Sequence, residues 1–274
     1  MEIRLIALDL DGTLLNSAKK ITDHTLNVLE RAAKKGLYIV PSTGRSVSGI
    51  PNILTDLSFI HYALTLNGAV VVNIKTKEII HECVYTFDEA LYLWDLIQKY
   101  DALPDCSING ELYMEQQTFL KLPDYTNDPK RIILMKQTRK ETDNIRKMLL
   151  QENAASAKMN LLFADSGIRQ KARQELEQLP FVDVSSSLDS NLELNRKGGN
   201  KGNGLKKLTE HLGLRMDEVM ACGDSDNDIT MIEAAGLGIA MANAVPKILN
   251  IANAVTLSND EDGVAYAIEK WVFN

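Results

Sequence analysis

Short apolar runs alternate with longer segments of helical periodicity along the first third of the chain. The apolar runs are Ile3–Leu8, Leu37–Pro41 and Tyr62–Leu66, and none of them alternates strictly between apolar and polar residues. Strands without such alternation are typical of a parallel sheet that helices cover on both faces. Residues 22–35 begin with a capping residue and are followed by Gly36, as expected for a helix between two of these strands. The pattern therefore predicts a βαβαβ arrangement.

The pattern changes in the middle of the chain, where the segments are shorter and prolines interrupt them. Val70–Asn73 and Ile79–Val84 resemble a hairpin around a polar turn. From about Lys201 the alternation of strands and helices resumes. We therefore expect an inserted α+β unit, with strands over Arg131–Lys136, Asn160–Ala164, Phe181–Ser185 and Leu192–Asn195 and helices over Phe87–Tyr100, Lys140–Gln151 and Gly167–Gln178.

These segments define the predicted fold class and domain organisation. The fold is α/β, with a doubly wound parallel-sheet (Rossmann-like) core and an inserted α+β cap domain. Residues 1–83 and 192–274 form the predicted core, and residues 84–191 form the predicted cap. A chain of 274 residues is long enough to give both domains a hydrophobic core.

Composition and charge exclude several classes of function. The formal net charge is −7, and no run of lysines and arginines occurs, so we expect no nucleic-acid partner. No apolar stretch of the sequence approaches membrane-spanning length, so we expect no membrane partner. The three cysteines are widely spaced and odd in number, which indicates free thiols in a reducing compartment. We therefore expect a cytoplasmic protein, whereas its oligomeric state is not encoded in these patterns.

Two carboxylates follow the first apolar run. Asp9 and Asp11 are two residues apart, so their side chains point to the same face of an extended chain, and Gly12 then allows a sharp turn. Like charges held this close favour a bound cation, and an aspartate in such a place is also a candidate nucleophile. The alternative is a strand that ends in an ordinary polar Asp-Gly turn.

A second acidic cluster follows a later apolar run. Asp224 and Asp228 come after the predicted strand Glu218–Cys222 and at the start of a predicted helix. Open α/β sheets bind ligands beyond the carboxyl ends of their strands, so these acids can converge with Asp9 and Asp11 if the two strands are neighbours. Carboxylates without a set of histidines or cysteines suit Mg²⁺. The alternative is that the acids only cap the helix.

An anionic ligand beside these acids would need compensating donors. Thr43 and Gly44 lie at another predicted strand end, where a hydroxyl and backbone N–H groups can bind phosphate oxygens. Lys201 begins a predicted helix and opposes its dipole, a conflict typical of functional residues, although a solvated loop lysine fits equally well. Arg45 is a candidate for binding substrate or for pairing with a structural carboxylate.

In this order, the motifs resemble those of the haloacid dehalogenase superfamily of phosphatases. They are Asp9–Thr13, Thr43–Arg45, Lys201–Gly202 and Gly223–Asp228. The chain is most similar to the Cof-type subfamily, in which a large α/β cap is inserted between the second and third motifs. The resemblance extends over essentially the whole chain, and the motif residues in order are far more specific than any one of them.

The resemblance implies a mechanism and a role for each motif residue. Asp9 would attack phosphorus and form an aspartyl-phosphate, and Asp11 would act as general acid and then as general base. Mg²⁺ would be held by Asp9, Asp224, Asp228 and the backbone carbonyl of Asp11. The phosphoryl oxygens would be bound by Leu10, Thr43, Gly44, Lys201 and Asn227.

The resemblance thus predicts Mg²⁺-dependent hydrolysis of small phosphorylated metabolites such as sugar phosphates. A phosphosugar mutase is one alternative, and it would need a bisphosphate activator and a second phosphate site. A regulatory or binding protein that keeps the fold without turnover is another. Phosphate release distinguishes the hydrolase from both alternatives.

Overall fold

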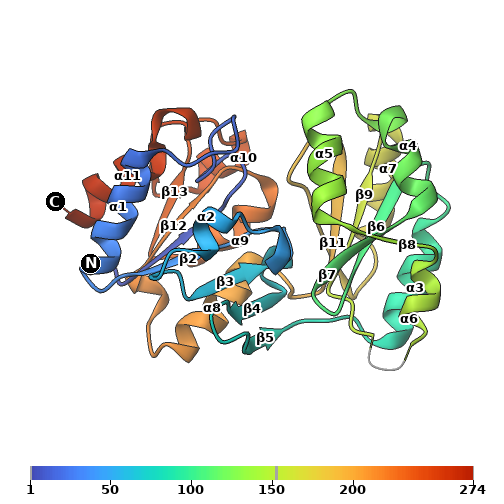
Figure 1. The fold of residues 1–274 in the computed structure, drawn as a ribbon, viewed down its shortest axis with the longest axis horizontal. Coiled ribbons are helices and arrows are strands. Elements are labelled where there is room, and N and C mark those ends of the chain that lie inside the picture. Colours follow the sequence, from blue (N-terminus) through green and yellow to red (C-terminus); the bar gives the residue numbers. More distant parts are fainter. Residues whose placement is uncertain (1, 152–153, 274) are drawn as a thin grey trace. The chain divides into compact units, whose positions relative to one another are not determined.

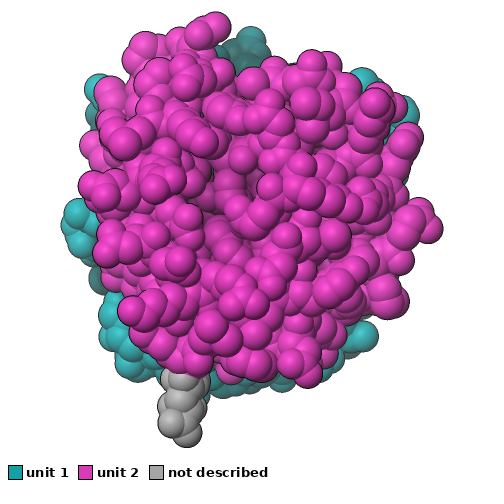
Figure 2. All heavy atoms as spheres, turned by 90° about the vertical axis from the view of Figure 1, so that its right-hand side faces the viewer, with its two compact units in different colours: residues 1–44, 51–81, 200–274 teal, residues 45–50, 82–199 magenta. Residues whose placement is uncertain are grey.

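The computed structural model describes residues 2–151 and 154–273. Contacts between residues divide the chain into two compact units. Unit 1 contains residues 1–44, 51–81 and 200–274, and unit 2 contains residues 45–50 and 82–199 (Figure 2). Each unit is assembled from segments that are distant in sequence. No helix within the described residues combines the length and the apolar character that a membrane span requires.

Unit 1 is organised around a five-stranded parallel sheet. Its strands lie in the order β14 (Ala254–Val255), β13 (Leu237–Ala240), β12 (Val219–Gly223), β1 (Leu5–Leu8) and β2 (Tyr38–Pro41). Each strand runs parallel to its neighbours. All residues of β1 are buried, as expected for a strand that is covered on both faces. The predicted α/β class with a parallel sheet is therefore confirmed.

Helices flank this sheet (Figure 1). α1 (Asp23–Lys34) packs against α11 (Gly263–Ile268), whereas α8 (Lys201–His211) packs against α9 (Ile229–Ala234). α9 also contacts α10 (Pro246–Ile251). Lys201 is the first residue of α8, and this end of the helix lies near the carboxyl ends of β1 and β12.

A second, three-stranded sheet in the first half of the chain differs from the prediction. β3 (Tyr62–Thr65) was expected to be a third strand of the parallel sheet. An isolated parallel bridge between Ser42 and Leu64 joins it to the end of β2, in the predicted direction. Over all of its residues, however, it pairs with β4 (Val70–Asn73) in the antiparallel sense, and β5 (Ile79–Glu82) completes this second sheet.

Unit 2 contains a six-stranded mixed sheet. Its neighbouring strands are antiparallel, except that Glu111–Glu115 and Lys140–Thr142, at one edge, are parallel. This topology agrees with the α+β character expected for the middle of the chain. The strand order is β10 (Val182–Ser185), β11 (Asn191–Arg196), β9 (Lys158–Leu162), β6 (Leu103–Ile108), β7 (Glu111–Glu115) and β8 (Lys140–Thr142).

The sheet of unit 2 has an apolar core on each face. Successive residues of a strand point to opposite faces, so Leu161 of β9 joins one core and Leu162 joins the other. Leu161 packs in the core that includes residues of α3 (Phe87–Ile97), α6 (Ile145–Leu149) and α7 (Ser166–Leu176). Leu162 packs in the core that includes residues of α4 (Gln116–Tyr125) and α5 (Pro129–Thr138).

The prediction of a strand over Arg131–Lys136 is wrong, because these residues lie in α5. Asp128 caps this helix by accepting a hydrogen bond from Lys130 N at 2.9 Å, and Pro129 occupies the first helical turn. The β-branched isoleucines of the segment favoured a strand, but the start signal and the packing of one apolar face decide the helix. The predicted helix over Lys140–Gln151 is likewise shorter, since β8 precedes α6.

The boundary of unit 2 also differs from the predicted cap. β11 pairs with β9, with Leu192 opposite Leu161 and Leu194 opposite Met159, so unit 2 extends to Gly199, past the predicted boundary at residue 191. Residues 45–50 belong to unit 2 as well, because they contact α5 and because Ser48 Oγ donates to Glu111 Oε2 at 2.6 Å.

Candidate active site

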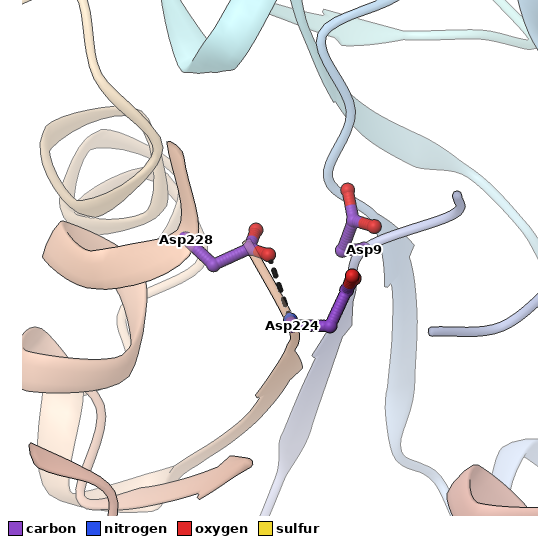
Figure 3. A group of neighbouring side chains, drawn as sticks. All are labelled: Asp9, Asp224 and Asp228. Carbon is purple, nitrogen blue, oxygen red and sulfur yellow. Dashed lines mark hydrogen bonds between the residues drawn. The ribbon is translucent and has the colours of Figure 1, made fainter. Parts of the chain in front are cut away.

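Aspartates from two neighbouring strand ends lie together in unit 1. β1 and β12 pair with Leu8 opposite Cys222, so the residues that follow these strands leave the sheet side by side. One carboxylate oxygen each from Asp9, Asp224 and Asp228 lies within 4.8 Å of the other two (Figure 3). The two acidic segments of the sequence therefore meet at one edge of the sheet.

A buried lysine neutralises part of this charge. Lys201 Nζ donates to Asp9 Oδ1 at 2.5 Å and to Asp228 Oδ1 at 2.6 Å, and its side chain is 0% exposed. Burial by itself lowers the pKa of Lys201, but the carboxylates of Asp228 and Asp9 outweigh burial and raise that pKa above its ordinary value. Lys201 is therefore a charged member of the cluster and not a solvated loop lysine.

The cluster keeps an excess of negative charge. Burial raises the pKa of Asp9 well above its usual range; attraction to Lys201 opposes this shift, and repulsion from Asp228 and Asp224 adds to it. Burial, and then repulsion from Asp228, raises the pKa of Asp224 to about 6. One ammonium does not balance three carboxylates, so the ionised cluster favours a further cation.

The loop after β1 holds Asp224 in a fixed orientation. Thr13 Oγ1 donates to Asp224 Oδ1 at 2.9 Å, and Ser225 Oγ donates to Asp224 Oδ2 at 2.9 Å. Gly12 has a φ of +94°, and a Cβ at this position would lie 2.8 Å from Asp224 Cγ. Only glycine therefore allows the loop to turn here and to approach the carboxylate this closely.

Asp228 is positioned by the backbone at the start of the following helix. Its Oδ2 accepts hydrogen bonds from Asp224 N at 2.9 Å and from Ser225 N at 3.0 Å (Figure 3). Its Oδ1 faces Lys201. Asp228 thus completes a capping box with Ser225 at the 3₁₀ turn Asp226–Asp228, whereas it makes no side-chain cap bond to α9. It belongs to the charged cluster at the same time.

Asp11 lies outside this group of three carboxylates. Its side chain is 35% exposed, and its Oδ1 accepts from Lys19 Nζ at 2.7 Å. Lys19 has a left-handed backbone, with a φ of 58°, and no periodic or motif signal in the sequence marked it as a partner of Asp11. Asp11 is therefore placed at the edge of the site, where its carboxyl group can reach solvent.

The cluster fits a hard divalent cation. All donors are oxygens, they converge within a small volume, and the raised pKa values of Asp9 and Asp224 show that an additional positive charge would stabilise the ionised form. Asp9, Asp224 and Asp228 supply these oxygens, whereas a role of the backbone carbonyl of Asp11 stays a prediction.

Two of the predicted phosphate-binding residues, Thr43 and Asn227, are connected through Asn67. Thr43 is buried, its N–H donates to Leu64 O at 2.8 Å, and its carbonyl accepts from Asn67 N at 3.0 Å. Asn227 Nδ2 donates to Asn67 Oδ1 at 3.2 Å, so one donor of Asn227 is already used. In the described part of the chain Asn227 Oδ1 is buried without a hydrogen-bond partner, and Leu10 N–H has no acceptor. Gly44 follows Thr43 at the same strand end.

Asn67 was not predicted as a site residue. It has a φ of 63° and is 3% exposed, which places an amide between the Thr43 and Asn227 segments. The Asn67–Gly68 pair after an apolar strand signals a turn, but only the fold shows what the turn contacts. A Cβ on Gly68 would lie 2.8 Å from Lys201 Cα, so this glycine allows α8 to approach.

Arg45 is the one predicted site residue assigned to unit 2 by its contacts. Its Nη1 donates to Gly49 O at 2.9 Å, which orders the turn that contains residues 45–50. A role of Arg45 in binding substrate stays a prediction.

Comparisons with known proteins agree with this geometry. A family model described as haloacid dehalogenase-like hydrolase matches residues 6–268. The chain is 32% identical over 272 residues to the 5-amino-6-(5-phospho-D-ribitylamino)uracil phosphatase YcsE of Bacillus subtilis, covering 99% of this chain and 97% of the relative.

Solved structures show the same fold. A haloacid dehalogenase-like hydrolase from B. subtilis has a TM-score of 0.88 at 27% identity, over 98% of this chain and 100% of the other. Another from Bacteroides thetaiotaomicron has a TM-score of 0.80 at 31% identity, over 98% and 99% of the two chains. The family predicted from the motif order is confirmed: this chain belongs to the haloacid dehalogenase-like hydrolases.

Proposed function

We propose that the protein hydrolyses small phosphomonoesters with the help of Mg²⁺ and through an aspartyl-phosphate. The observation that carries this proposal is the group of Asp9, Asp224, Asp228 and Lys201, of which all but the half-buried Asp224 are buried. It joins a candidate nucleophile, a candidate cation site and a fixed ammonium. A structural salt bridge does not explain why so many charges are buried together, because burying ions without a further function is costly.

In the first step, an oxygen of the Asp9 carboxylate attacks phosphorus. The new Asp9 O–P bond forms while the bond between phosphorus and the ester oxygen breaks. Asp11 donates its proton to the departing oxygen, which leaves as an alcohol. Lys201 Nζ, already hydrogen-bonded to Asp9, is placed to stabilise charge on the phosphoryl group.

In the second step, the Asp11 carboxylate accepts a proton from water as the water oxygen attacks phosphorus. The Asp9 O–P bond breaks, phosphate leaves, and both aspartates return to their starting protonation states. The partial exposure of Asp11 suits this role, because its carboxyl group must meet both leaving group and water.

Mg²⁺, when bound, reduces the repulsion between Asp9 and the phosphate dianion and stabilises negative charge in the transition state. Asp9, Asp224 and the carbonyl of Asp11 would hold it, while Asp228 orients the Asp224 segment and Lys201. The N–H groups of Leu10 and Gly44, the Thr43 hydroxyl and the Asn227 amide would bind the phosphoryl oxygens.

The relatives indicate the class of substrate. YcsE acts, by its name, on the phosphate ester of a ribityl chain, which is a primary phosphomonoester of a polyol. Among the substrates that we propose, sugar phosphates and related metabolites, those esterified at a terminal carbon share this primary alcohol leaving group.

A phosphate-release assay over a panel of phosphorylated metabolites, with and without EDTA, tests the proposal. We expect Mg²⁺-dependent release that Asp9→Asn abolishes while the circular dichroism spectrum is kept. Asp217→Asn is the matched control, because it removes a surface carboxylate that pairs with Arg215. Activity that persists in Asp9→Asn would contradict the assignment of Asp9 as nucleophile. Activity that EDTA does not reduce would contradict the dependence on Mg²⁺.

The same assay separates the alternatives. A mutase would convert a hexose phosphate into its isomer without free phosphate and would need a bisphosphate. A binding protein would show no turnover of any ester. The family membership favours hydrolysis over both.

A further inference from the structure

Two segments near the end of the chain hold the loop that follows the candidate catalytic aspartates. The loop spans residues 12–22 and leads into the first turn of α1, and we call the residues that bind this region the clasp: Asn243, Asn259, Asp260 and Asp262. Asn243 Nδ2 donates to Gly12 O at 2.8 Å, and Asn259 Nδ2 donates to Leu15 O at 3.0 Å. The two asparagines are joined, since Asn259 N donates to Asn243 Oδ1 at 3.0 Å.

The two acids of the clasp bind the rest of the loop. Asp260 accepts hydrogen bonds from Ser17 N at 2.8 Å and Ser17 Oγ at 2.7 Å. Asp262 Oδ1 accepts from Thr22 Oγ1 at 2.5 Å and from Thr25 Oγ1 at 2.9 Å. The loop is therefore bound along its length by residues that follow it by more than two hundred positions.

Asp11 lies inside the turn that the asparagines hold. Leu15 N donates to Leu10 O at 2.8 Å, and an isolated bridge pairs Asp11 with Leu15. Asn243 therefore binds the carbonyl next to Asp11, and Asn259 binds the carbonyl of its bridge partner. No hydrogen bond joins the clasp to Asp9 or Asp224 in the described residues. Asp224 touches the same turn through Thr13 Oγ1, but Ser225 Oγ and the bond from Asp224 N to Asp228 also hold it. Loss of a clasp bond therefore acts first on Asp11.

The junction between loop and clasp combines polar contacts with buried apolar side chains. A cavity of about 10 Å³ lies between them and is lined by Thr13, Asn16, Thr22, Asn259 and Asp262, among others. Leu14, Leu15 and Ile21 of the loop are buried, so they keep the loop in place when one hydrogen bond is removed. We therefore expect such a loss to shift the turn locally.

We propose that Asn243 is a positioning residue for the general acid: its bond to Gly12 O sets where the Asp11 carboxyl group lies relative to the leaving oxygen. This inference rests on the proposed function. Its consequence depends on the leaving group. An alkoxide must receive the Asp11 proton as the ester bond breaks, whereas p-nitrophenolate leaves without a proton. A displaced Asp11 therefore slows only the first kind of ester.

The experiment compares kcat/KM for a primary alkyl phosphate that the enzyme hydrolyses with kcat/KM for p-nitrophenyl phosphate. The ratio is informative because kcat/KM reports the step in which the leaving group departs. For Asn243→Ala we expect a loss of about tenfold or more with the alkyl ester, and a loss within about twofold with the nitrophenyl ester. Asn259→Ala should change the ratio in the same direction.

Asn253→Ala is the matched control, because Asn253 also bonds a backbone group, accepting from Gly238 N at 2.7 Å, but is remote from the loop. Its ratio should equal that of the wild type. If Asn243→Ala does not fold, Asn243→Asp takes its place. This variant keeps the size of the side chain and the oxygen that accepts from Asn259 N, but it loses the N–H group that donates to Gly12 O. Equal losses with both esters in the folded variants would overturn the inference.

Failure of the proposed function would look different. A wild-type protein without Mg²⁺-dependent hydrolysis would remove the mechanism itself. An active wild type in which Asp11→Asn changes the ratio, but the Asn243 variants do not, would keep the mechanism and refute only the positioning role.

Discussion

At the scale of single residues, the charges of the site compensate one another only in part. Lys201 contacts Asp9 and Asp228, and Asp224 is oriented by hydroxyls and not by a cation. Each buried charge therefore depends on its neighbours, and removing one partner leaves another ion without compensation.

Lys201→Met tests this dependence. We expect loss of activity and a decrease of about 3–5 kcal/mol in the free energy of unfolding, because Asp9 and Asp228 lose their buried counter-charge. Urea denaturation measures the change. Lys207→Met is the control: it removes an exposed pair with Glu210, so its effect should stay below about 1 kcal/mol. A Lys201 variant as stable as the control would argue against this account.

The raised pKa values predict how Mg²⁺ and pH act together. In the metal-free protein, Asp224 binds its proton with a pKa of about 6, against an ordinary 3.8, and Asp9 is shifted in the same direction. The native state thus holds more protons than the unfolded state over this range. The free energy of unfolding contributed by these groups falls as pH rises through the native pKa.

Because Mg²⁺ binds the ionised carboxylates, the rise in Tm that Mg²⁺ causes should be larger above the Asp224 pKa of about 6 than below it. Thermal unfolding with Mg²⁺ and with EDTA at both pH values measures this difference. Asp224→Asn should reduce the rise at the higher pH. A rise in Tm that is equal at both values would contradict the assignment of the metal ligands.

At the scale of elements, the site depends on how closely α8 approaches the turn at Gly68. Gly204 lies in α8, and a Cβ on it would come 2.9 Å from Gly68 Cα. A Cβ on Gly202 would come 2.7 Å from the carbonyl carbon of Thr230. These glycines weaken the helix intrinsically but allow Lys201 to reach both carboxylates.

Gly204→Ala therefore should destabilise the protein, although alanine is the better helix former by about 1 kcal/mol. We expect a loss of about 1–3 kcal/mol from overpacking and a lower kcat, because α8 must move and carry Lys201 with it. Chemical denaturation and kinetics measure both. Lys206→Ala, at an exposed position of the same helix, should leave both almost unchanged. An increase in the free energy of unfolding in Gly204→Ala would show that a methyl group fits between α8 and the turn at Gly68, and it would contradict this account.

At the scale of the whole molecule, the two units have separate sheets and separate apolar cores, and the carboxylate cluster belongs to unit 1 alone. Unit 2 contains its own buried ion pair, with Lys158 Nζ 3.2 Å from Glu193 Oε2. Ligand binding to one unit need not stabilise the other.

Calorimetry should therefore resolve two unfolding transitions, of which Mg²⁺ raises only one. Glu193→Gln should lower the other, because it removes the carboxylate charge 3.2 Å from the buried Lys158 ammonium and leaves the charge of Asp105 as weaker compensation. A single transition that Mg²⁺ and Glu193→Gln shift together would contradict independent units.

Local sequence was sufficient for the parallel core and the motif positions. Unbroken apolar runs, caps and Gly12 act over a few residues, so Asp9, Asp224 and Asp228 could be placed at strand ends. That these ends are adjacent depends on the pairing of β1 with β12, which only the fold shows. The segment Arg131–Lys136 was misread, because its propensity favoured a strand whereas tertiary packing selected α5.

Other features depend on contacts between residues far apart in the chain. Pairing with β9 assigns β11 to unit 2, and the approach of α8 brings Lys201 into contact with two carboxylates. The hydrogen bonds of Asn67 with Asn227 and of Asn243 with Gly12 could not be predicted from any periodic pattern in the sequence. Periodicity and capping report the interactions of near neighbours. The compensation of buried charges and the positions of loops depend on tertiary contacts, which form only when distant parts of the chain pack together.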